Sequence, residues 1–167
     1  MITDSAVVHV RMGQLAIGQS PTVLKTTLGS CVGIALLWRE RAVYALAHCL
    51  LPYAPQPDCE PGGRYVDLAV ISMLRMLKAE DRHHTQIEAH IAGGANMSRQ
   101  ERQTTAPSYL AVGKLNIEAA EHVLGNLQIP LLSRDVGGFC ARQMYLDCVT
   151  AEIHVLHVPA PTLARGH

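Results

Sequence analysis

Two apolar runs separated by one short polar break constrain most strongly how this chain can fold. The first run covers residues 31–38, the second covers residues 42–48, and the break between them is Arg39-Glu40-Arg41. Neither run contains a charged residue, and both include β-branched or aromatic side chains, which is typical of strands buried on both faces. The pattern predicts a buried β-hairpin.

The hairpin predicts which residues face each other. If a loop of three to five residues joins the strands, the numbers of facing residues add to about 79 or 80. Cys31 would then lie opposite His48 or Cys49. A thiol and an imidazole would be direct neighbours or one register step apart.

The rest of the chain predicts a mixed α/β domain. Apolar residues at three- and four-residue spacing predict one helix over residues 66–77, and Asn116 is expected to be the N-cap of a second helix with Ile117 on its inner face. Further strands are predicted around residues 6–11, 22–27, 87–92, 130–133, 141–147 and 152–158. We expect a single-domain layered sandwich of mixed β-sheet over residues 1–158, with two main helices.

Three segments are predicted to lack regular structure. Residues 52–63 contain four prolines and two glycines and read as a loop. Residues 98–109 are polar and are expected to be mobile, and residues 159–167 are expected to be a frayed tail.

Composition excludes several classes of function. The chain has 167 residues, 49% of them apolar, with 14 basic and 14 acidic side chains and no basic stripe. Nucleic acid and anionic membrane surfaces are therefore poor candidates as partners. No apolar stretch has the length of a membrane span or of a signal-peptide core, so a cytoplasmic location is expected.

The five cysteines, at positions 31, 49, 59, 140 and 148, include no pair with metal-ligand spacing. They are expected to be free thiols, mostly filling the core, with Cys59 in the proline-rich loop the most exposed.

Cys31 and His48 are the candidate catalytic residues. Cys31 follows Gly29 and Ser30, where a tight turn can point backbone amides at a ligand. His48 ends an apolar strand, and a histidine there needs a hydrogen-bond partner. Each could be a core residue, but together they suit a nucleophile and its general base.

A third group should orient the imidazole, and the residues leave several candidates open. These are Thr26, Thr27, Asp67 and Asp135. Arg142 is expected to bind Asp135 or a substrate carbonyl.

Several motifs in a fixed order resemble one known family. They are Leu28-Gly29-Ser30-Cys31-Val32, His48 followed by Leu51-Pro52, Arg64-Tyr65-Val66-Asp67, Gly93-Gly94-Ala95-Asn96-Met97, Gly113 with Asn116, and Asp135-Val136-Gly137-Gly138 with Arg142. Over roughly residues 7–158 the chain resembles the chemoreceptor glutamine deamidases of bacterial chemotaxis, the CheD family.

The resemblance implies a layered α/β fold similar to that of deamidating bacterial toxins. It also implies hydrolysis of a receptor glutamine to glutamate with release of ammonia, by Cys31 as nucleophile and His48 as general base and acid. No metal or organic cofactor is implied. The implied partners are chemoreceptor cytoplasmic helices as substrate and a phosphatase of the CheC type.

The chain departs from the family pattern at the third catalytic position. Members usually carry a hydroxyl residue six positions before the cysteine, and that position here is Lys25, followed by Thr26. Because neighbouring residues of a strand point to opposite faces, Thr26 is expected to replace the hydroxyl only if the local register shifts. Lys25 could instead favour the Cys31 thiolate.

Two other functions are alternatives, and only the second uses Cys31 and His48 in the same way. One is a non-catalytic module that docks on chemoreceptors or on the phosphatase, and the other is a cysteine peptidase or transglutaminase-like enzyme. An active site predicts that Cys31 is alkylated near neutral pH, below the usual thiol pKa of about 8.5.

Overall fold

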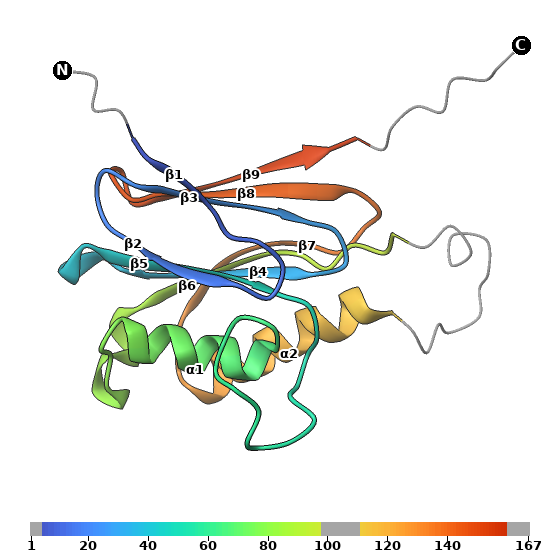
Figure 1. Ribbon diagram of the computed structural model, residues 1–167, viewed down its shortest axis with the longest axis horizontal. Helices are drawn as coiled ribbons and strands as arrows, with labels where there is room; N and C mark the ends of the chain where they lie inside the picture. The colour runs from blue at the N-terminus through green and yellow to red at the C-terminus, as the bar shows by residue number, and fades with distance from the viewer. Residues whose placement is uncertain (1–4, 98–110, 160–167) are drawn as a thin grey trace, which may run out of the picture.

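Two β-sheets and a pair of helices lie in three layers (Figure 1). The computed structural model describes residues 5–97 and 111–159. A four-stranded sheet packs on one face of a five-stranded sheet, and both helices cover the other face (Figure 1). The predicted α/β sandwich of mixed sheets with two main helices is confirmed.

The five-stranded sheet has the order β2-β5-β4-β6-β7. Its strands are β2 (Leu15–Gly18), β4 (Val32–Trp38), β5 (Val43–Cys49), β6 (Glu88–Gly93) and β7 (Leu131–Val136). All neighbours are antiparallel except β6 and β7. Every residue of β4 is buried, as expected for a strand covered by helices on one side and by a second sheet on the other.

The predicted hairpin is confirmed as β4 and β5, but its predicted register is wrong. Val32 pairs with Cys49 and Gly33 with His48, so that facing numbers add to 81. The short 3₁₀ turn η1 (Arg39–Arg41) extends to Ala42, which has a left-handed φ of 50° and donates its N–H to the Arg39 carbonyl. Ala42 therefore belongs to the turn, the second strand starts one residue later, and Cys31 precedes β4.

The four-stranded sheet has the order β1-β3-β8-β9. Its strands are β1 (Val7–His9), β3 (Val23–Leu28), β8 (Ala141–Asp147) and β9 (Glu152–Val158). Only β1 and β3 are parallel. The space between the two sheets is filled by buried side chains from both, including Leu24, Leu28, Leu37, Leu46, Met144 and Leu146.

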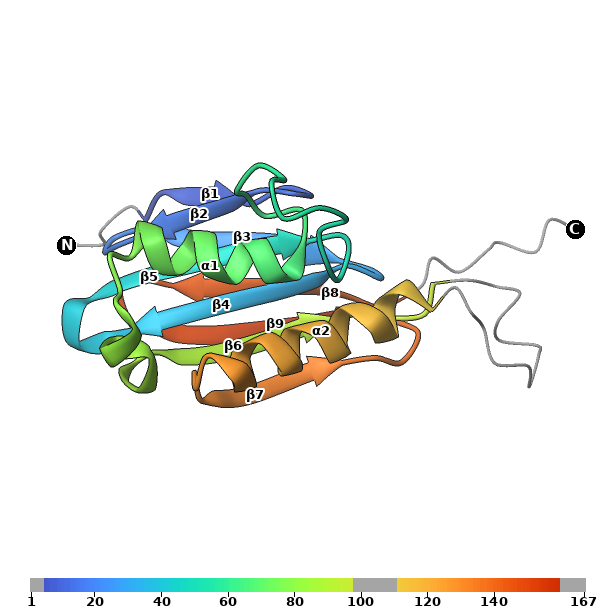
Figure 2. The same cartoon turned by 90° about the horizontal axis from the view of Figure 1, so that it is seen from below.

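The helices pack side by side on the five-stranded sheet (Figure 2). Helix α1 (Val66–Met76) covers β2 and β5, and α2 (Val112–Asn126) packs on β4, β6 and β7. The bounds of α1 agree with the predicted helix over residues 66–77 to within one residue. The second begins earlier than expected, with Ala111 at its N-cap, so the assignment of Asn116 as N-cap is wrong. Asn116 lies inside α2, fully buried, because its side chain binds other segments.

The remaining segments connect these layers. A second 3₁₀ turn, η2 (Asp81–Gln86), precedes β6, and residues 52–63 form the predicted loop. The segment 98–109 and nearly all of the predicted tail lie outside the described residues. No helix in the described ranges is both long and apolar enough to cross a membrane.

Helix α2 meets the end of β6 through two glycines. Gly94 has a φ of +64°, and a Cβ built on Gly113 would overlap the Gly94 carbonyl oxygen. This contact lets the backbone of α2 approach the backbone that follows β6. A second glycine of α2, Gly125, has nothing within 4 Å of its Cβ direction.

Gly113 and Gly125, both in α2, make a matched pair for mutation. We expect Gly113→Ala to lower the free energy of unfolding by about 1–3 kcal/mol, because the added methyl forces the backbones apart. Gly125→Ala should raise it by up to about 1 kcal/mol, since alanine is the better helix former. Urea unfolding of both variants measures these changes. Equal effects of the two substitutions would contradict the close approach at Gly113.

Candidate active site

A hydrogen bond across the two sheets orients His48. Thr26 on β3 is 2% exposed, and its Oγ1 lies 2.7 Å from His48 Nδ1 on β5. The same hydroxyl donates to the carbonyl oxygen of Val10, also at 2.7 Å. A hydroxyl has one proton, and a carbonyl can only accept, so Thr26 must accept from Nδ1–H. Neutral His48 is therefore protonated on Nδ1.

The other ring nitrogen of His48 is free to act as a base. Nε2 is buried and makes no hydrogen bond with any described residue, Cys31 included. Burial lowers the pKa of His48, an effect that the Val10 carbonyl partly opposes. The imidazole is thus neutral near pH 7, with its lone pair on Nε2.

Thr26 reaches His48 without any shift of strand register. β3 pairs continuously with β8, with Lys25 opposite Tyr145 and Thr26 opposite Met144. Thr26 faces the space between the sheets together with the buried Leu24 and Leu28. The β3–β8 ladder is unbroken at Thr26, so the strand's own alternation points its side chain at His48.

Lys25 lies on the opposite face of β3. Its Nζ is 5.0 Å from the centre of the Tyr145 ring, a cation–π contact. The expected influence of Lys25 on the Cys31 thiol is not found, because alternation along the strand points the ammonium group away from His48.

Of the four candidates for the third group, only Thr26 binds His48. Thr27 is exposed on the outer face of β3. The Asp67 carboxylate accepts from the backbone amides of Ala54 and Leu68, and so orders the start of α1 and the loop beside it.

Asp135 is also occupied elsewhere. The buried Arg142 donates to Asp135 at 2.8 Å and to the carbonyls of Gly137 and Cys140. His157 contacts the same carboxylate at 2.8 Å. Burial raises the pKa of Asp135, but hydrogen bonds from Arg142 and His157 outweigh it and hold the pKa below its usual value. The predicted Arg142–Asp135 pair is confirmed, and it shapes the turn between β7 and β8.

Cys31 sits in a turn whose carbonyl groups are all held by other segments. The Gly29 carbonyl accepts from Ala95 N–H at 2.9 Å and the Cys31 carbonyl from Gly94 N–H at 2.8 Å. The Ser30 carbonyl accepts from the side chain of Asn116 at 3.2 Å. The exit of β6 and the helix α2 therefore fix the backbone that carries the thiol.

Cys31 is half-buried, and it packs against the apolar side chains that fill the space between the sheets. Burial raises its pKa, the opposite of the lowered pKa expected from the sequence. With a raised thiol pKa and a lowered imidazole pKa, both side chains are uncharged near pH 7. Burial thus disfavours a free thiolate at Cys31.

The other four cysteines are less suited to catalysis. Cys49 and Cys148 are buried, and burial raises both pKa values, that of Cys148 to about 11. Cys59 is half-buried and Cys140 is exposed, so the expectation that Cys59 is the most exposed is wrong. No group of three histidine, cysteine or acidic side chains among the described residues is arranged to hold a metal ion.

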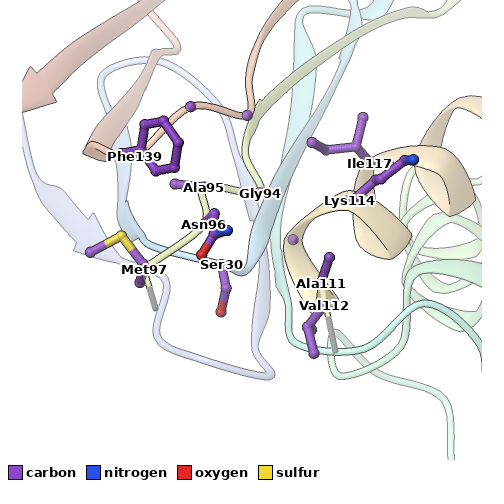
Figure 3. Close-up of a pocket in the computed structure, with 13 residues that line it drawn as sticks. Ser30, Gly94, Ala95, Asn96, Met97, Ala111, Val112, Lys114, Ile117 and Phe139 are labelled. Atoms are coloured by element: carbon purple, nitrogen blue, oxygen red, sulfur yellow. The ribbon is translucent and has the colours of Figure 1, made fainter. Parts of the chain in front are cut away.

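A cavity of about 730 Å³ lies beside the Cys31 turn and includes Ser30 in its wall. Figure 3 shows Asn96, Met97 and Phe139 on one side and Lys114 and Ile117 of α2 on the other. Met97 and Phe139 are both about half exposed. The wall is thus largely apolar, next to the residue that precedes Cys31.

The orientation of His48 can be tested directly. We expect Thr26→Val to remove the acceptor for Nδ1–H and to shift the neutral ring toward the Nε2–H tautomer, visible in its ¹⁵N chemical shifts. Thr26→Ser keeps the hydroxyl and should keep the tautomer. Thr27→Val, one residue along on the outer face, is the control. Unchanged His48 shifts in Thr26→Val would contradict the assignment.

Comparison with known proteins identifies the family. The CheD family model, described as chemotactic sensory transduction, matches residues 50–157, which begin just after His48. A probable chemoreceptor glutamine deamidase CheD 2 from Ruegeria sp. is 37% identical over 90% of this chain and 92% of its own length. That alignment covers enough of the chain to include both Cys31 and His48.

Two further relatives carry the name probable chemoreceptor glutamine deamidase CheD. The protein of Bdellovibrio bacteriovorus is 40% identical over 78% of this chain and 81% of its own length. That of Methanococcus vannielii is 35% identical over 84% of this chain and 88% of its own. This chain belongs to the CheD family of chemotactic sensory transduction proteins.

Proposed function

We propose that this protein deamidates glutamine side chains of chemoreceptors, with Cys31 as nucleophile, His48 as general base and acid, and Thr26 as the residue that orients His48. The names of its relatives support the substrate class. The observation that carries the proposal is the 2.7 Å Thr26–His48 hydrogen bond, which leaves a buried, unprotonated Nε2.

The reaction begins from the uncharged pair. His48 Nε2 takes the thiol proton while Cys31 Sγ attacks the carboxamide carbon of glutamine. The imidazolium then returns the proton to the leaving nitrogen, so that ammonia departs and a thioester remains. Water, deprotonated by His48, attacks the thioester, and the thiol leaves with the proton. One amide and one water become one carboxylic acid and one ammonia.

Thr26 contributes by holding the ring through both proton transfers. Nδ1–H stays hydrogen-bonded to Oγ1, and the Oγ1–H group stays donated to the Val10 carbonyl oxygen. No carboxylate takes part, so the imidazolium is stabilised by oriented dipoles rather than by a full negative charge. This is consistent with the lowered pKa of His48.

The cavity beside Ser30 is the proposed substrate site. Its largely apolar wall suits a packed surface of receptor helices, and Ser30 leads directly to the nucleophile. Receptor cytoplasmic segments as substrate imply a cytoplasmic location for the reaction. We assign the activity to one domain over residues 1–158, and include a phosphatase of the CheC type as a second partner.

The proposal is tested on a chemoreceptor cytoplasmic fragment by mass spectrometry. Intact protein should convert specific glutamines to glutamates, while Cys31→Ala or His48→Ala should lower the rate by about 10³-fold or more. Cys140→Ser, which changes an exposed thiol, is the matched control and should keep the full rate.

Other outcomes would identify a different function. Binding of the fragment without deamidation would indicate a docking module, and cleavage of its backbone would indicate a peptidase. Full deamidation by Cys31→Ala would exclude the proposed nucleophile.

The pH dependence of the reaction reports the state of His48. Its imidazole must be neutral to accept the thiol proton, and burial lowers its pKa. We expect kcat/KM to stay high as the pH falls through about 6.5, the usual imidazole pKa, and to decline only below it. A decline centred above that value, with the protein still folded by circular dichroism, would contradict a buried neutral base.

A further inference from the structure

Asn116 of α2 connects the two segments that carry Cys31 and His48. Its side chain is fully buried, and Nδ2 donates to the Ser30 carbonyl at 3.2 Å and to the Leu50 carbonyl at 2.9 Å. Ser30 immediately precedes Cys31, and Leu50 lies two residues after His48. One carboxamide thus holds both segments.

The two carbonyls lie where the central hairpin separates. Ladder pairing of β4 and β5 ends at Val32 and Cys49. Beyond that pair the Cys31 carbonyl binds Gly94 and the Leu50 amide binds Arg64. Within the described residues no backbone hydrogen bond joins the two diverging segments, so the carboxamide of Asn116 replaces the missing pairing.

The orientation of this carboxamide follows from its partners. Exchanging its nitrogen and oxygen would place Oδ1 against the two carbonyl oxygens, and neither of these can donate a hydrogen bond. In the orientation found, Oδ1 is buried and has no partner within the described chain. That unmet acceptor offsets part of the stability that the two hydrogen bonds provide. Stability alone is therefore a poor explanation for a carboxamide here.

We propose that Asn116 is a positioning residue, whose two N–H groups set the separation between the Cys31 turn and the strand end that carries His48. The proposal rests on the function proposed above. Proton transfer from thiol to imidazole is sensitive to that separation, since a misplacement of about 1 Å can lower a rate about 10²-fold. Asn116 acts only through the two backbone carbonyls.

The test measures how strongly Cys31 reactivity depends on His48. Iodoacetamide alkylation of Cys31 is followed near pH 7 by peptide mass spectrometry, with the exposed Cys140 as internal reference. The proteins are wild type, His48→Ala, Asn116→Ser and the double variant. We expect His48→Ala to slow Cys31 alkylation at least about tenfold in wild type but less than about twofold in Asn116→Ser.

Two more variants separate positioning from stability. Leu124→Ala removes a buried side chain of the same helix that belongs to the core under the helices, whereas Cys31 packs against the core between the sheets, and it should keep the full dependence on His48. Asn116→Gln keeps both N–H groups on a longer arm and carries the comparison if Asn116→Ser does not fold. We also expect the Asn116 variants to lower kcat for deamidation more than they change KM.

The outcomes distinguish this proposal from the proposed function. Equal effects of His48→Ala in both backgrounds would overturn the role of Asn116 and leave the catalytic pair intact. No effect of His48→Ala in wild type would overturn both. If Cys31 alkylation no longer depends on His48 in Leu124→Ala, a loosened core alone is sufficient to uncouple the two residues. That result would overturn the positioning role of Asn116.

Discussion

Pairing between β4 and β5 is the constraint on which the rest of this structure depends. Both strands are buried, so their backbone polar groups must bond to each other and to neighbouring strands. That requirement fixes His48 opposite Gly33, in the middle layer of the molecule. Only where the ladder ends can the backbone turn away, and Cys31 lies at that point. The candidate site thus lies where β4 and β5 stop pairing and the chain leaves the buried hairpin.

The site needs both sheets, because His48 comes from one and Thr26 from the other. The hydroxyl of Thr26 has a single O–H to donate, and it donates it in the hydrogen bond to the carbonyl oxygen of Val10. The direction of the next hydrogen bond is then determined, and with it the tautomer of His48. A carboxylate in the same place would hold the ring through a full charge and raise its pKa. A hydroxyl orients the ring while leaving it neutral.

Much of this arrangement could be predicted from local pattern, and the errors have physical causes. The hairpin, α1 and the last two strands follow from apolar periodicity. The register was missed because Ala42 adopts a left-handed φ to close a turn, which an apolar alanine does not reveal. The inward direction of Thr26 was predictable, since it alternates with Leu24 and Leu28 on one face. The role of Asn116 was not, because its partners are backbone atoms distant in sequence.

The uncharged resting state follows from the same burial that builds the site. Removing the thiol and the imidazole from water disfavours both ions, so an ion pair would need nearby charges to stabilise it. Lys25, a nearby cation in sequence, lies on the outer face of β3 beside Tyr145. In the proposed reaction, proton transfer from Cys31 to His48 therefore occurs together with attack on the substrate, when the new charge is spread over the reacting carbonyl. For that reaction the relative position of thiol and imidazole matters more than the pKa of either, and this is the reason for proposing a positioning role for the carboxamide that joins the Ser30 and Leu50 carbonyls.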